Sequence, residues 1–178
     1  NEWYAAQTSK KIRAVWRSKS DKGERVSSAV PYGYMKSSDD SKQWIIDDAV
    51  ADNVRYIFRL CLEGHGPTKI ARRLEQEKIM TPTAYYLSVG RPTSNKLQKG
   101  IYQWSENSVN HILENIQYTG CTVNFKTSVL SYKVHKTIYN DENDWQIIPN
   151  TQKAIIDEDT WNRVQELKKH RRRNTVTG

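Results

Sequence analysis

Four short polar side chains that could contact DNA bases lie near the start of a predicted helix over residues 105–116. They are Asn107, Ser108, Asn110 and His111. Their amide, hydroxyl and imidazole groups donate and accept hydrogen bonds without a fixed charge. The opposite side of the helix predicts a core face, because Val109, Ile112 and Leu113 recur at helical spacing. This combination suits a helix that reads base edges in the major groove, whereas the alternative is an ordinary amphipathic helix with a solvated polar face.

The chain is polar and basic. Its 178 residues include 28 Lys and Arg against 20 Asp and Glu, which gives a net charge of +8, and 37% of them are hydrophobic. The mean hydropathy of −0.83 indicates an elongated molecule, built as one good-sized domain or one domain with appendages. Positive charge gathers in residues 1–25 and 168–173. Basic ends with a mixed middle favour a polyanionic partner and suit a protein that lies along a phosphate backbone.

The sequence argues against several other classes of protein. No stretch has the apolar length of a membrane helix, and no signal-peptide pattern is recognised. Cys61 and Cys121 lack Cys-x-x-Cys spacing, so they predict neither a metal site nor a disulfide framework, and we expect a reducing, cytoplasmic location. The four histidines lie in different contexts, and no serine has a base beside it. A standalone hydrolase is therefore disfavoured, and we expect no catalytic residue.

Hydrophobic periodicity predicts an α+β fold that is mainly α-helical. Helices are predicted over residues 2–19, 47–63, 67–78, 105–116 and 157–171, and short strands over 44–46, 121–125, 133–138 and 145–148. The middle three helices predict a helix-turn-helix-like core, preceded by the end of a long helix. The last three strands predict a small antiparallel sheet, in which residues 140–143 form the turn between the final pair.

Local signals predict where the helices begin and which faces they bury. Asp47 or Asp48, Ser105 and Asp157 are the expected N-caps. Pro67 suits the first position of a helix, because its missing N–H has no partner there. The first helix offers four apolar packing positions, namely Tyr4, Ile12, Val15 and Trp16.

Two basic segments between these elements lack periodicity. The linker over residues 18–30 contains Lys19, Lys22 and Arg25, which are expected in a DNA minor groove unless the linker is a flexible tether. Residues 83–103 are predicted as one long loop without acidic residues. The cations expected there are Arg91, Lys96 and Lys99. This loop is either a second contact arm or disordered without its ligand.

Several short motifs follow one another in a specific order. They are NEWYA at 1–5, TSKKIRAV at 8–15, PYGY at 31–34, VRYIF at 54–58, IARRL at 70–74, IMTP at 79–82, WS at 104–105, ILEN at 112–115, YTG at 118–120 and AIID at 154–157. In this order the chain resembles the large serine recombinases, specifically the recombinase DNA-binding domain that follows their catalytic domain. The resemblance covers nearly the whole chain. It departs locally at Gln152-Lys153, where the family often has His-Pro.

The resemblance implies a division of the chain. Residues 1–20 would be the end of a long helix from a catalytic domain before Asn1, 21–30 a linker, 31–150 the DNA-binding domain, and 151–178 a lead-in helix towards a zinc ribbon. The family's nucleophilic serine and the four zinc-binding cysteines would then lie outside this sequence, so the chain itself is expected to need no cofactor. The parent protein is expected to be a dimer on each site and a tetramer in synapsis, and this chain a monomer.

The resemblance also implies a function. The chain would bind double-stranded DNA sequence-specifically at one half of an attachment site, in a protein that integrates, excises or inverts mobile DNA. Asn107, Ser108, Asn110 and His111 would contact bases, and the linker and loop cations would contact the backbone and minor groove. The phosphate contacts expected on the helix over 67–78 are Thr68, Lys69, Arg72 and Arg73. Two alternatives are a helix-turn-helix transcriptional regulator and a module whose basic surface binds an acidic protein.

Overall fold

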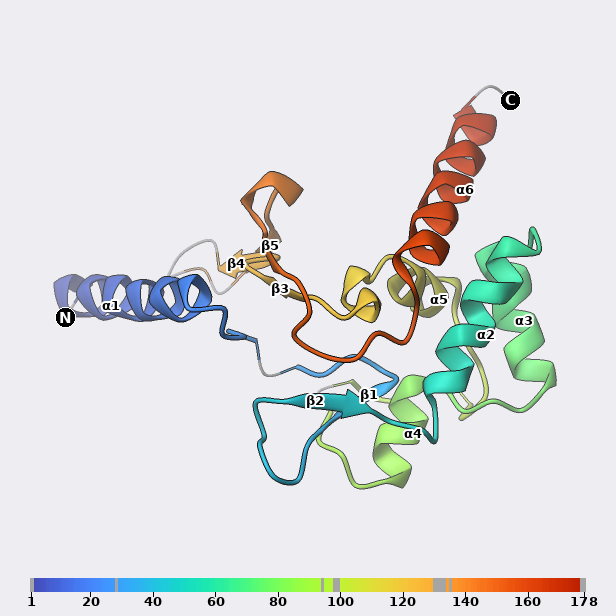
Figure 1. Ribbon diagram of the computed structural model, residues 1–178, viewed down its shortest axis with the longest axis horizontal. Helices are drawn as coiled ribbons and strands as arrows, with labels where there is room; N and C mark the ends of the chain where they lie inside the picture. Colours follow the sequence, from blue (N-terminus) through green and yellow to red (C-terminus); the bar gives the residue numbers. More distant parts are fainter. Residues whose placement is uncertain are drawn as a thin grey trace.

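The computed structural model describes residues 2–27, 29–93, 95–97, 100–129, 134 and 136–176. The helices within these residues are α1 (Glu2–Asp21), α2 (Ala51–Leu62), α3 (Pro67–Gln76), α4 (Pro82–Ser88), α5 (Glu106–Leu113) and α6 (Glu158–Val176), with the 3₁₀ turns η1 (Ile116–Thr119) and η2 (Glu142–Asp144). The strands are β1 (Tyr34–Lys36), β2 (Trp44–Ile46), β3 (Thr122–Asn124), β4 (Thr127–Val129), β5 (Thr137–Tyr139) and β6 (Gln146–Ile148). Figure 1 shows α1 projecting from one side of the body and α6 from the other. The predicted class, α+β and mainly α, is confirmed.

The core is formed by α2, α3 and α5, with α6 packed across them. Each of the three helices buries one apolar stripe, because its hydrophobic residues recur at helical spacing. The buried residues are Val54, Ile57, Phe58 and Cys61 of α2, Ile70, Ala71 and Leu74 of α3, and Val109, Ile112 and Leu113 of α5. Val164 of α6 is fully buried against this cluster. The predicted helices therefore exist, and their predicted faces are the buried ones.

Most of the predicted helix starts are confirmed. Ser105 Oγ accepts the backbone N–H of Ser108 at 3.1 Å, and Pro67 opens α3. Asp157 Oδ1 accepts the N–H of Thr160 at 2.8 Å, at the start of α6. The prediction for α2 is wrong, because the cap position is Val50 and no side chain caps that helix.

The strands form three separate two-stranded antiparallel ladders, β1–β2, β3–β6 and β4–β5. The predicted pairing of the last two strands through residues 140–143 is wrong. Phe125 has a φ of +60°, which redirects the chain after β3, so β4 leaves to pair with β5 and β6 pairs with β3. The turn region itself contains η2, where Asp141 Oδ1 accepts the N–H of Asn143 at 2.9 Å. Lys133 and His135, in the strand predicted over 133–138, lie outside the described residues.

Part of the predicted long loop over 83–103 is a helix instead. Thr81 caps α4, since its Oγ1 accepts the N–H of Ala84, and Pro82 occupies the first turn. Tyr85 packs edge-on against Tyr32, with ring centroids 6.0 Å apart, and donates a hydrogen bond to Asp47 Oδ2 at 2.8 Å. Burial and this carboxylate raise the pKa of Tyr85 to about 12. The carboxylate predicted to cap α2 therefore holds α4.

Two buried tyrosines join the helical core to the segments around it. Tyr118 donates a hydrogen bond to the carbonyl of Tyr32 at 2.7 Å, and Tyr34 donates one to the carbonyl of Lys153 at 2.8 Å. The rings of Tyr34 and Tyr118 are stacked with centroids 6.1 Å apart. Complete burial raises the pKa of Tyr118 well above its usual value. The turn before β1 reaches this centre through Gly33, whose φ is +97°.

Helix α1 is exposed along most of its length. The apolar residues predicted to pack, Tyr4, Ile12, Val15 and Trp16, are 72, 44, 53 and 46% exposed. Among the described residues, the helix contacts the body near its C-terminal end, where Ser20 is buried and the Arg17 guanidinium lies 5.9 Å from the centre of the Phe125 ring. None of the helices in the described residues is long and apolar enough to cross a membrane.

Candidate nucleic-acid interface

The polar face of α5 offers two exposed side chains and two that are already engaged. Asn107 and His111 are exposed. The Ser108 hydroxyl lies 2.8 Å from Ser105 Oγ, so it belongs to the cap of the helix. Asn110 Oδ1 accepts a hydrogen bond from Lys168 Nζ of α6 at 3.1 Å. The four residues predicted to read bases thus share one face, but only part of it is open to a ligand.

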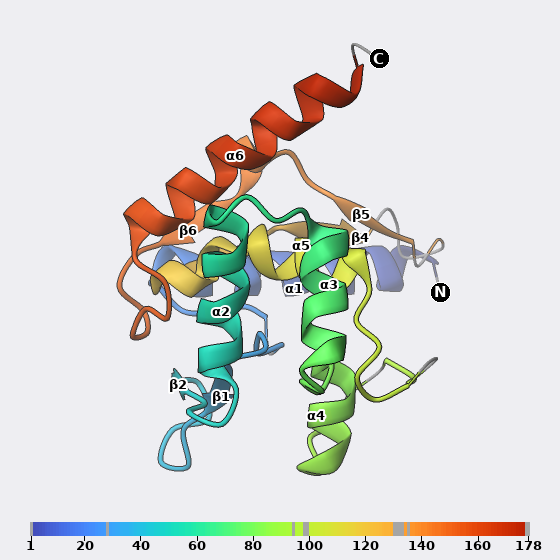
Figure 2. The same cartoon turned by 90° about the vertical axis from the view of Figure 1, so that its right-hand side faces the viewer.

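A groove of about 590 Å³ lies along this face, and we call it the α5 groove. Its walls are α5, the start of α3 and the second half of α6, and Figure 2 shows α6 passing over α5 and α2. Lys168 also binds Glu114 Oε1 at 2.6 Å, and only 12% of the Lys168 side chain is exposed. The groove therefore presents two amides and an imidazole, and its charged lining residues are the acids Glu106 and Glu114 and the α6 cations Lys168 and Arg171.

The four residues predicted on α3 separate into two groups. Thr68 donates a hydrogen bond to Glu106 Oε2 at 3.0 Å and so ties the first turn of α3 to that of α5. Lys69, Arg72 and Arg73 line a different, smaller hollow of about 180 Å³, to which Leu60 of α2 and His65 also contribute. Arg73 is paired with Glu77 on its own helix, and this hydrogen bond is the main reason why the pKa of Glu77 is lowered.

The cations predicted on the loop over 83–103 also differ from one another. Arg91 is folded inward, because its guanidinium donates hydrogen bonds to the carbonyls of Tyr34 and Val30 and lies 4.2 Å from the centre of the Tyr86 ring. This arrangement holds the chain after α4 against β1, so the guanidinium of Arg91, which the sequence predicts as a phosphate contact, is engaged within the protein. Lys96 is exposed, and Lys99 lies outside the described residues.

Replacing Arg91 by glutamine is expected to lower the free energy of unfolding by about 1–3 kcal/mol, because two charge-assisted hydrogen bonds to backbone carbonyls are lost. Urea unfolding measures this difference. Lys96→Gln is the matched control, and its stability should be unchanged because Lys96 is exposed. If Arg91→Gln left the free energy of unfolding unchanged but weakened nucleic-acid binding, Arg91 would instead be a nucleic-acid contact.

The segment after α1 is bound to the body rather than free. We call residues 20–26 the strap. Arg25 donates hydrogen bonds to Thr122 Oγ1 and Gln152 Oε1, both at 2.7 Å, and to the carbonyl of Lys42 at 2.9 Å. Its guanidinium also lies 3.5 Å from the centre of the Trp44 ring. Burial lowers the pKa of Arg25, but an arginine remains charged at any pH where proteins fold. Arg25, which the sequence predicts as a minor-groove contact, thus anchors the strap to the body.

Asn124 of β3 is the second anchor of the strap. Its Oδ1 accepts the N–H of Val26 at 3.0 Å, while its Nδ2 donates to Ser20 Oγ at 2.7 Å and to the carbonyl of Glu24 at 2.9 Å. Gln146 of β6 adds two hydrogen bonds to Ser20. A tether that contacts nothing, which was the alternative for the linker, is therefore wrong over residues 20–26.

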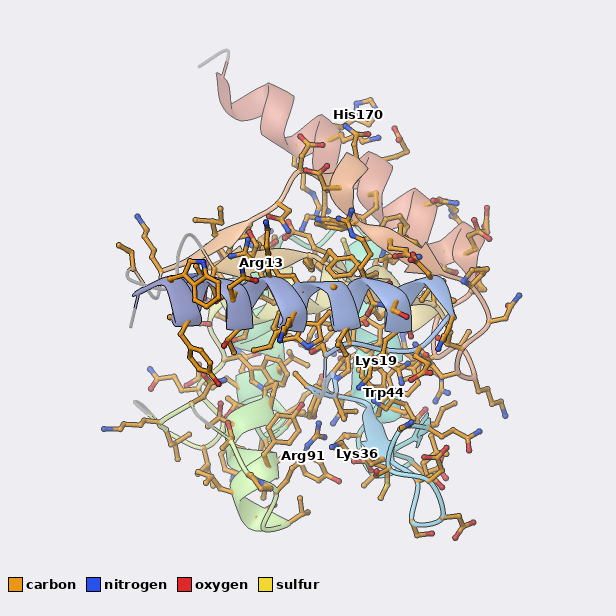
Figure 3. All side chains as sticks on the ribbon, turned by 90° about the vertical axis from the view of Figure 1, so that its left-hand side faces the viewer. Arg13, Lys19, Lys36, Trp44, Arg91 and His170 are labelled. Carbon is orange, nitrogen blue, oxygen red and sulfur yellow. The ribbon has the colours of Figure 1, made fainter. Side chains whose placement is uncertain are left out.

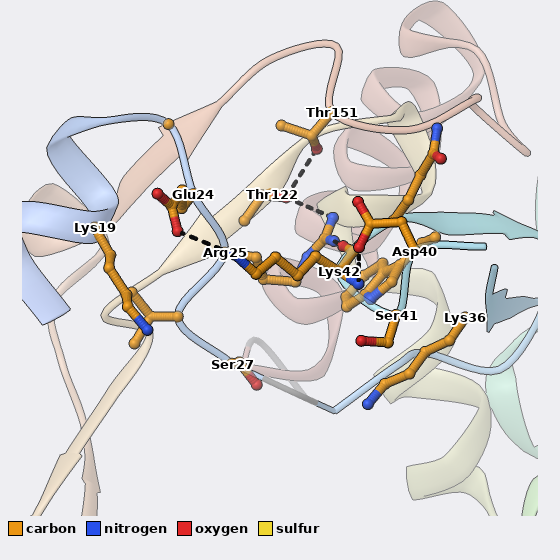
Figure 4. A pocket seen from close by; sticks show the side chains of 14 residues that line it. Lys19, Glu24, Arg25, Ser27, Lys36, Asp40, Ser41, Lys42, Thr122 and Thr151 are labelled. Carbon is orange, nitrogen blue, oxygen red and sulfur yellow. Dashed lines mark hydrogen bonds and ion pairs between the residues drawn. The ribbon is translucent and has the colours of Figure 1, made fainter. Parts of the chain in front are cut away.

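A cavity of about 670 Å³ opens between the strap, the end of α1 and the β1–β2 hairpin, and we call it the strap cavity (Figure 4). Four cations line it, Lys19, Arg25, Lys36 and Lys42. Figure 3 shows Lys19, Lys36 and Trp44 on the same side of the molecule, below α1. The sequence predicted a role for Lys19 and Arg25 but missed Lys36 and Lys42, which lie in or beside short strands without any recognisable motif.

Metal and nucleophile chemistry find no support among the described residues. No three His, Cys, Asp or Glu side chains in this part of the chain are placed to hold a metal ion. Both cysteines are buried and engaged, since Cys121 Sγ lies 3.3 Å from the carbonyl of Ile116 and Cys61 Sγ accepts a contact from Arg171 at 3.7 Å. They do not fit the zinc ribbon that the resemblance implies. In the described hydrogen bonds, no serine hydroxyl contacts a histidine.

Comparison with known proteins gives one family and two similar folds. The sequence profile of the Recombinase family matches residues 48–171. A crystal structure of an LSR–DNA complex has a TM-score of 0.51 at 17% identity over 90% of this chain and 38% of that chain. A structure from a study of the Listeria innocua prophage attP site has a TM-score of 0.54 at 18% identity over 89% of this chain and 51% of that chain. The chain thus spans about two fifths to one half of these structures. No curated protein matches it.

Proposed function

Since the chain belongs to the Recombinase family, we propose that it is the DNA-binding segment of a site-specific serine recombinase and binds one half of an attachment site. One observation carries the proposal beyond the family match. The α5 groove lies within residues 48–171 and places exposed amide and imidazole groups beside Lys168 and Arg171. Uncharged donors and acceptors suit base edges.

Asn107 and Asn110 are assigned different roles in base reading. Asn107 is exposed, so both ends of its amide are available for a bidentate contact with adenine. The amide oxygen of Asn110 is held by Lys168, which fixes the amide with its NH₂ group turned away from that ammonium. Asn110 therefore acts mainly as a donor, to an acceptor such as guanine N7 or O6. His111 lies one residue further along, is exposed, and completes this surface.

Lys69, Arg72 and Lys96 are assigned to the phosphate backbone. All three are exposed, and no ion pair joins them to an acidic side chain in the described residues. Such contacts fix the position of a protein on the duplex and carry little sequence information. Arg73 is a weaker candidate, because Glu77 already neutralises it.

The reaction of the whole protein is assigned to residues outside this sequence. We propose that a serine of a separate catalytic domain cleaves the DNA, that a dimer occupies each site and a tetramer joins two sites, and that this chain binds as a monomer. Zinc, if the parent protein holds it, would be bound by cysteines other than Cys61 and Cys121, which are buried and engaged.

Selection of bound duplexes from a random pool at moderate salt tests the proposal. We expect one non-palindromic motif of about one to two helical turns. The affinity for that motif should fall steeply as salt rises, while the preference over a scrambled duplex is kept. Binding that disappears as salt rises and that selects no motif would indicate a nonspecific basic surface and contradict the proposal. Capture of acidic proteins without any duplex binding would favour the protein-interaction alternative.

Asn107→Ala is expected to remove about 1–3 kcal/mol of discrimination at one position of the selected motif, roughly 5- to 150-fold. The folded protein should be as stable as the wild type, because Asn107 is exposed. Asn162→Ala is the matched control, since Asn162 is an exposed asparagine in α6 that does not line the α5 groove. Equal loss of affinity for the selected and scrambled duplexes would contradict a base contact. The measurement is a titration of both duplexes at one salt concentration.

A further inference from the structure

We propose that the strap cavity is a separate DNA-backbone site, in which a phosphate of the duplex lies between Lys19 of α1 and Lys36 of β1. The proposal rests on the proposed function, because it takes double-stranded DNA as the partner. It does not depend on α5 as the reading helix, since none of the residues that line the strap cavity belongs to α5.

The first support is that the cavity is built before any ligand arrives. Its floor is the stack of Arg25 on Trp44, and Trp44 is almost completely buried. Arg25 is held by Thr122 and by the carbonyl of Lys42, so the strap and the β1–β2 hairpin are fixed relative to each other. A volume of about 670 Å³ lies within the range of small-ligand sites and can admit a backbone phosphate with its sugar.

The second support is the charge that remains unneutralised. Lys42 Nζ lies 3.9 Å from the Glu24 carboxylate, so these two side chains largely cancel. The other acidic residue of the cavity, Asp40, accepts the backbone N–H of Lys42 at 2.9 Å and keeps its charge, so four cations and two acids leave the lining with a net charge of +2. Lys19 and Lys36 are exposed, and within the described residues no carboxylate lies within 4 Å of either ammonium. Two cations without counter-ions in one hollow favour an anion there.

The third support is the geometry around these two lysines. Figure 4 shows them on opposite sides of the cavity, with Ser27 between them. The Ser27 hydroxyl accepts the N–H of Ala29 at 3.3 Å, and its own proton is available to donate. Two ammonium groups and one hydroxyl around a single hollow match the several acceptor oxygens of a phosphate group.

The fourth support favours a long polyanion over a small phosphate compound. Lys11 precedes Lys19 by eight residues on α1 and lies about a quarter-turn from it around the helix axis. They are separated by about 12 Å along the axis at 1.5 Å per residue. Phosphates of one DNA strand rise about 3.4 Å per step, so this separation spans three to four steps. A duplex with one phosphate in the strap cavity could thus continue along α1 towards Lys11, whereas a free phosphate compound could not reach that residue.

The test compares Lys19→Gln, Lys36→Gln and the double variant on the selected duplex and on a scrambled one across a salt series. The double variant should make the slope of log K against log salt less negative by about 0.9, because one phosphate contact is lost, and each single variant should give part of that change. The affinity for both duplexes should fall by the same factor, because a phosphate contact carries no sequence information. Thermal unfolding should be unchanged, since both lysines are exposed and without ion pairs.

Lys78→Gln is the matched control, because Lys78 is exposed and does not line the cavity. An equal change in slope for this control would overturn the proposal, since it would show a general effect of charge. A loss confined to A·T-rich duplexes would overturn it in favour of a minor-groove contact. Inorganic phosphate that stabilises the wild type but not the double variant, without any change in duplex affinity, would assign the cavity to a free phosphate compound. If the wild type binds no duplex, the proposed function fails. If the wild type selects a motif and the lysine variants have the same slope of log K against log salt as the wild type, only this inference fails.

Discussion

Asn124→Ala is expected to release the strap and lower the free energy of unfolding by roughly 2–4 kcal/mol. The side chain is 2% exposed and makes three hydrogen bonds, to Ser20, Glu24 and Val26. Alanine removes all three and leaves the backbone N–H of Val26 and the carbonyl of Glu24 without these partners. Each buried polar group left without a partner costs about 1–3 kcal/mol, and partial access of water to the strap reduces the sum.

Urea unfolding measures this loss, and limited proteolysis locates it. Cleavage should appear within residues 20–26 of the variant and be absent there in the wild type. Asn143→Ala is the control, because Asn143 is exposed and its hydrogen bonds within the described residues go to Asp141, two positions before it. A change below about 0.5 kcal/mol would show that Arg25 and Gln146 hold the strap without Asn124.

The variant also has a functional consequence. With the strap released, Lys19 is no longer held opposite Lys36, so the salt-dependent part of DNA affinity should fall. The preference for the selected motif should persist, because α5 lies in a different part of the fold. Loss of the preference as well would mean that the strap supports the reading helix.

Gly33→Ala is expected to destabilise the protein by roughly 2–5 kcal/mol. Gly33 has a φ of +97°, and an added Cβ would lie 2.9 Å from Val54 Cγ2 and 3.0 Å from Ile155 Cδ1. The backbone conformation accounts for about 1–2 kcal/mol, and the overpacking against two buried side chains for about 1–3 kcal/mol.

Gly64→Ala separates these two contributions. Gly64 has nearly the same φ, +95°, but nothing lies within 4 Å of its added Cβ. The free energy of unfolding of Gly64→Ala should therefore fall by the conformational contribution alone, about 1–2 kcal/mol. The difference between the unfolding midpoints of Gly33→Ala and Gly64→Ala, in urea or on heating, then measures the cost of overpacking the turn before β1. Equal destabilisation of both variants would show that this turn relaxes freely.

The parts of the fold that the sequence predicted are those set by neighbouring residues. Ser105, Pro67 and Asp157 mark helix starts through contacts within one turn, so their residue types suffice. The buried stripe of α2 follows from its spacing alone. The Thr81-Pro82 pair carries the same kind of start signal for α4, but that helix has only seven residues and no full period of apolar positions.

The parts that the sequence could not predict depend on partners far along the chain. The sequence predicts Arg25 as a linker cation, because the residues that bind it, Thr122 and Gln152, are about a hundred positions away. The sequence predicts Arg91 as a loop cation, because its acceptors are backbone carbonyls, which every residue has and which the sequence therefore cannot identify. The strand partners likewise depend on the positive φ of Phe125, a residue type that rarely adopts it.

The strap also bears on the order in which the chain assembles. Apart from Arg25–Lys42, which are 17 positions apart, its hydrogen bonds to the body join residues separated by 97 to 127 positions. Closing loops of this length costs entropy before the contacts form, whereas α2, α3 and the turn between them need only local contacts. The strap is therefore expected to close after the barrier to folding has been crossed. A variant with a weakened strap should then fold at nearly the same rate as the wild type but unfold faster. The hydrogen bonds of Asn124 to the strap would therefore set the lifetime of the native state.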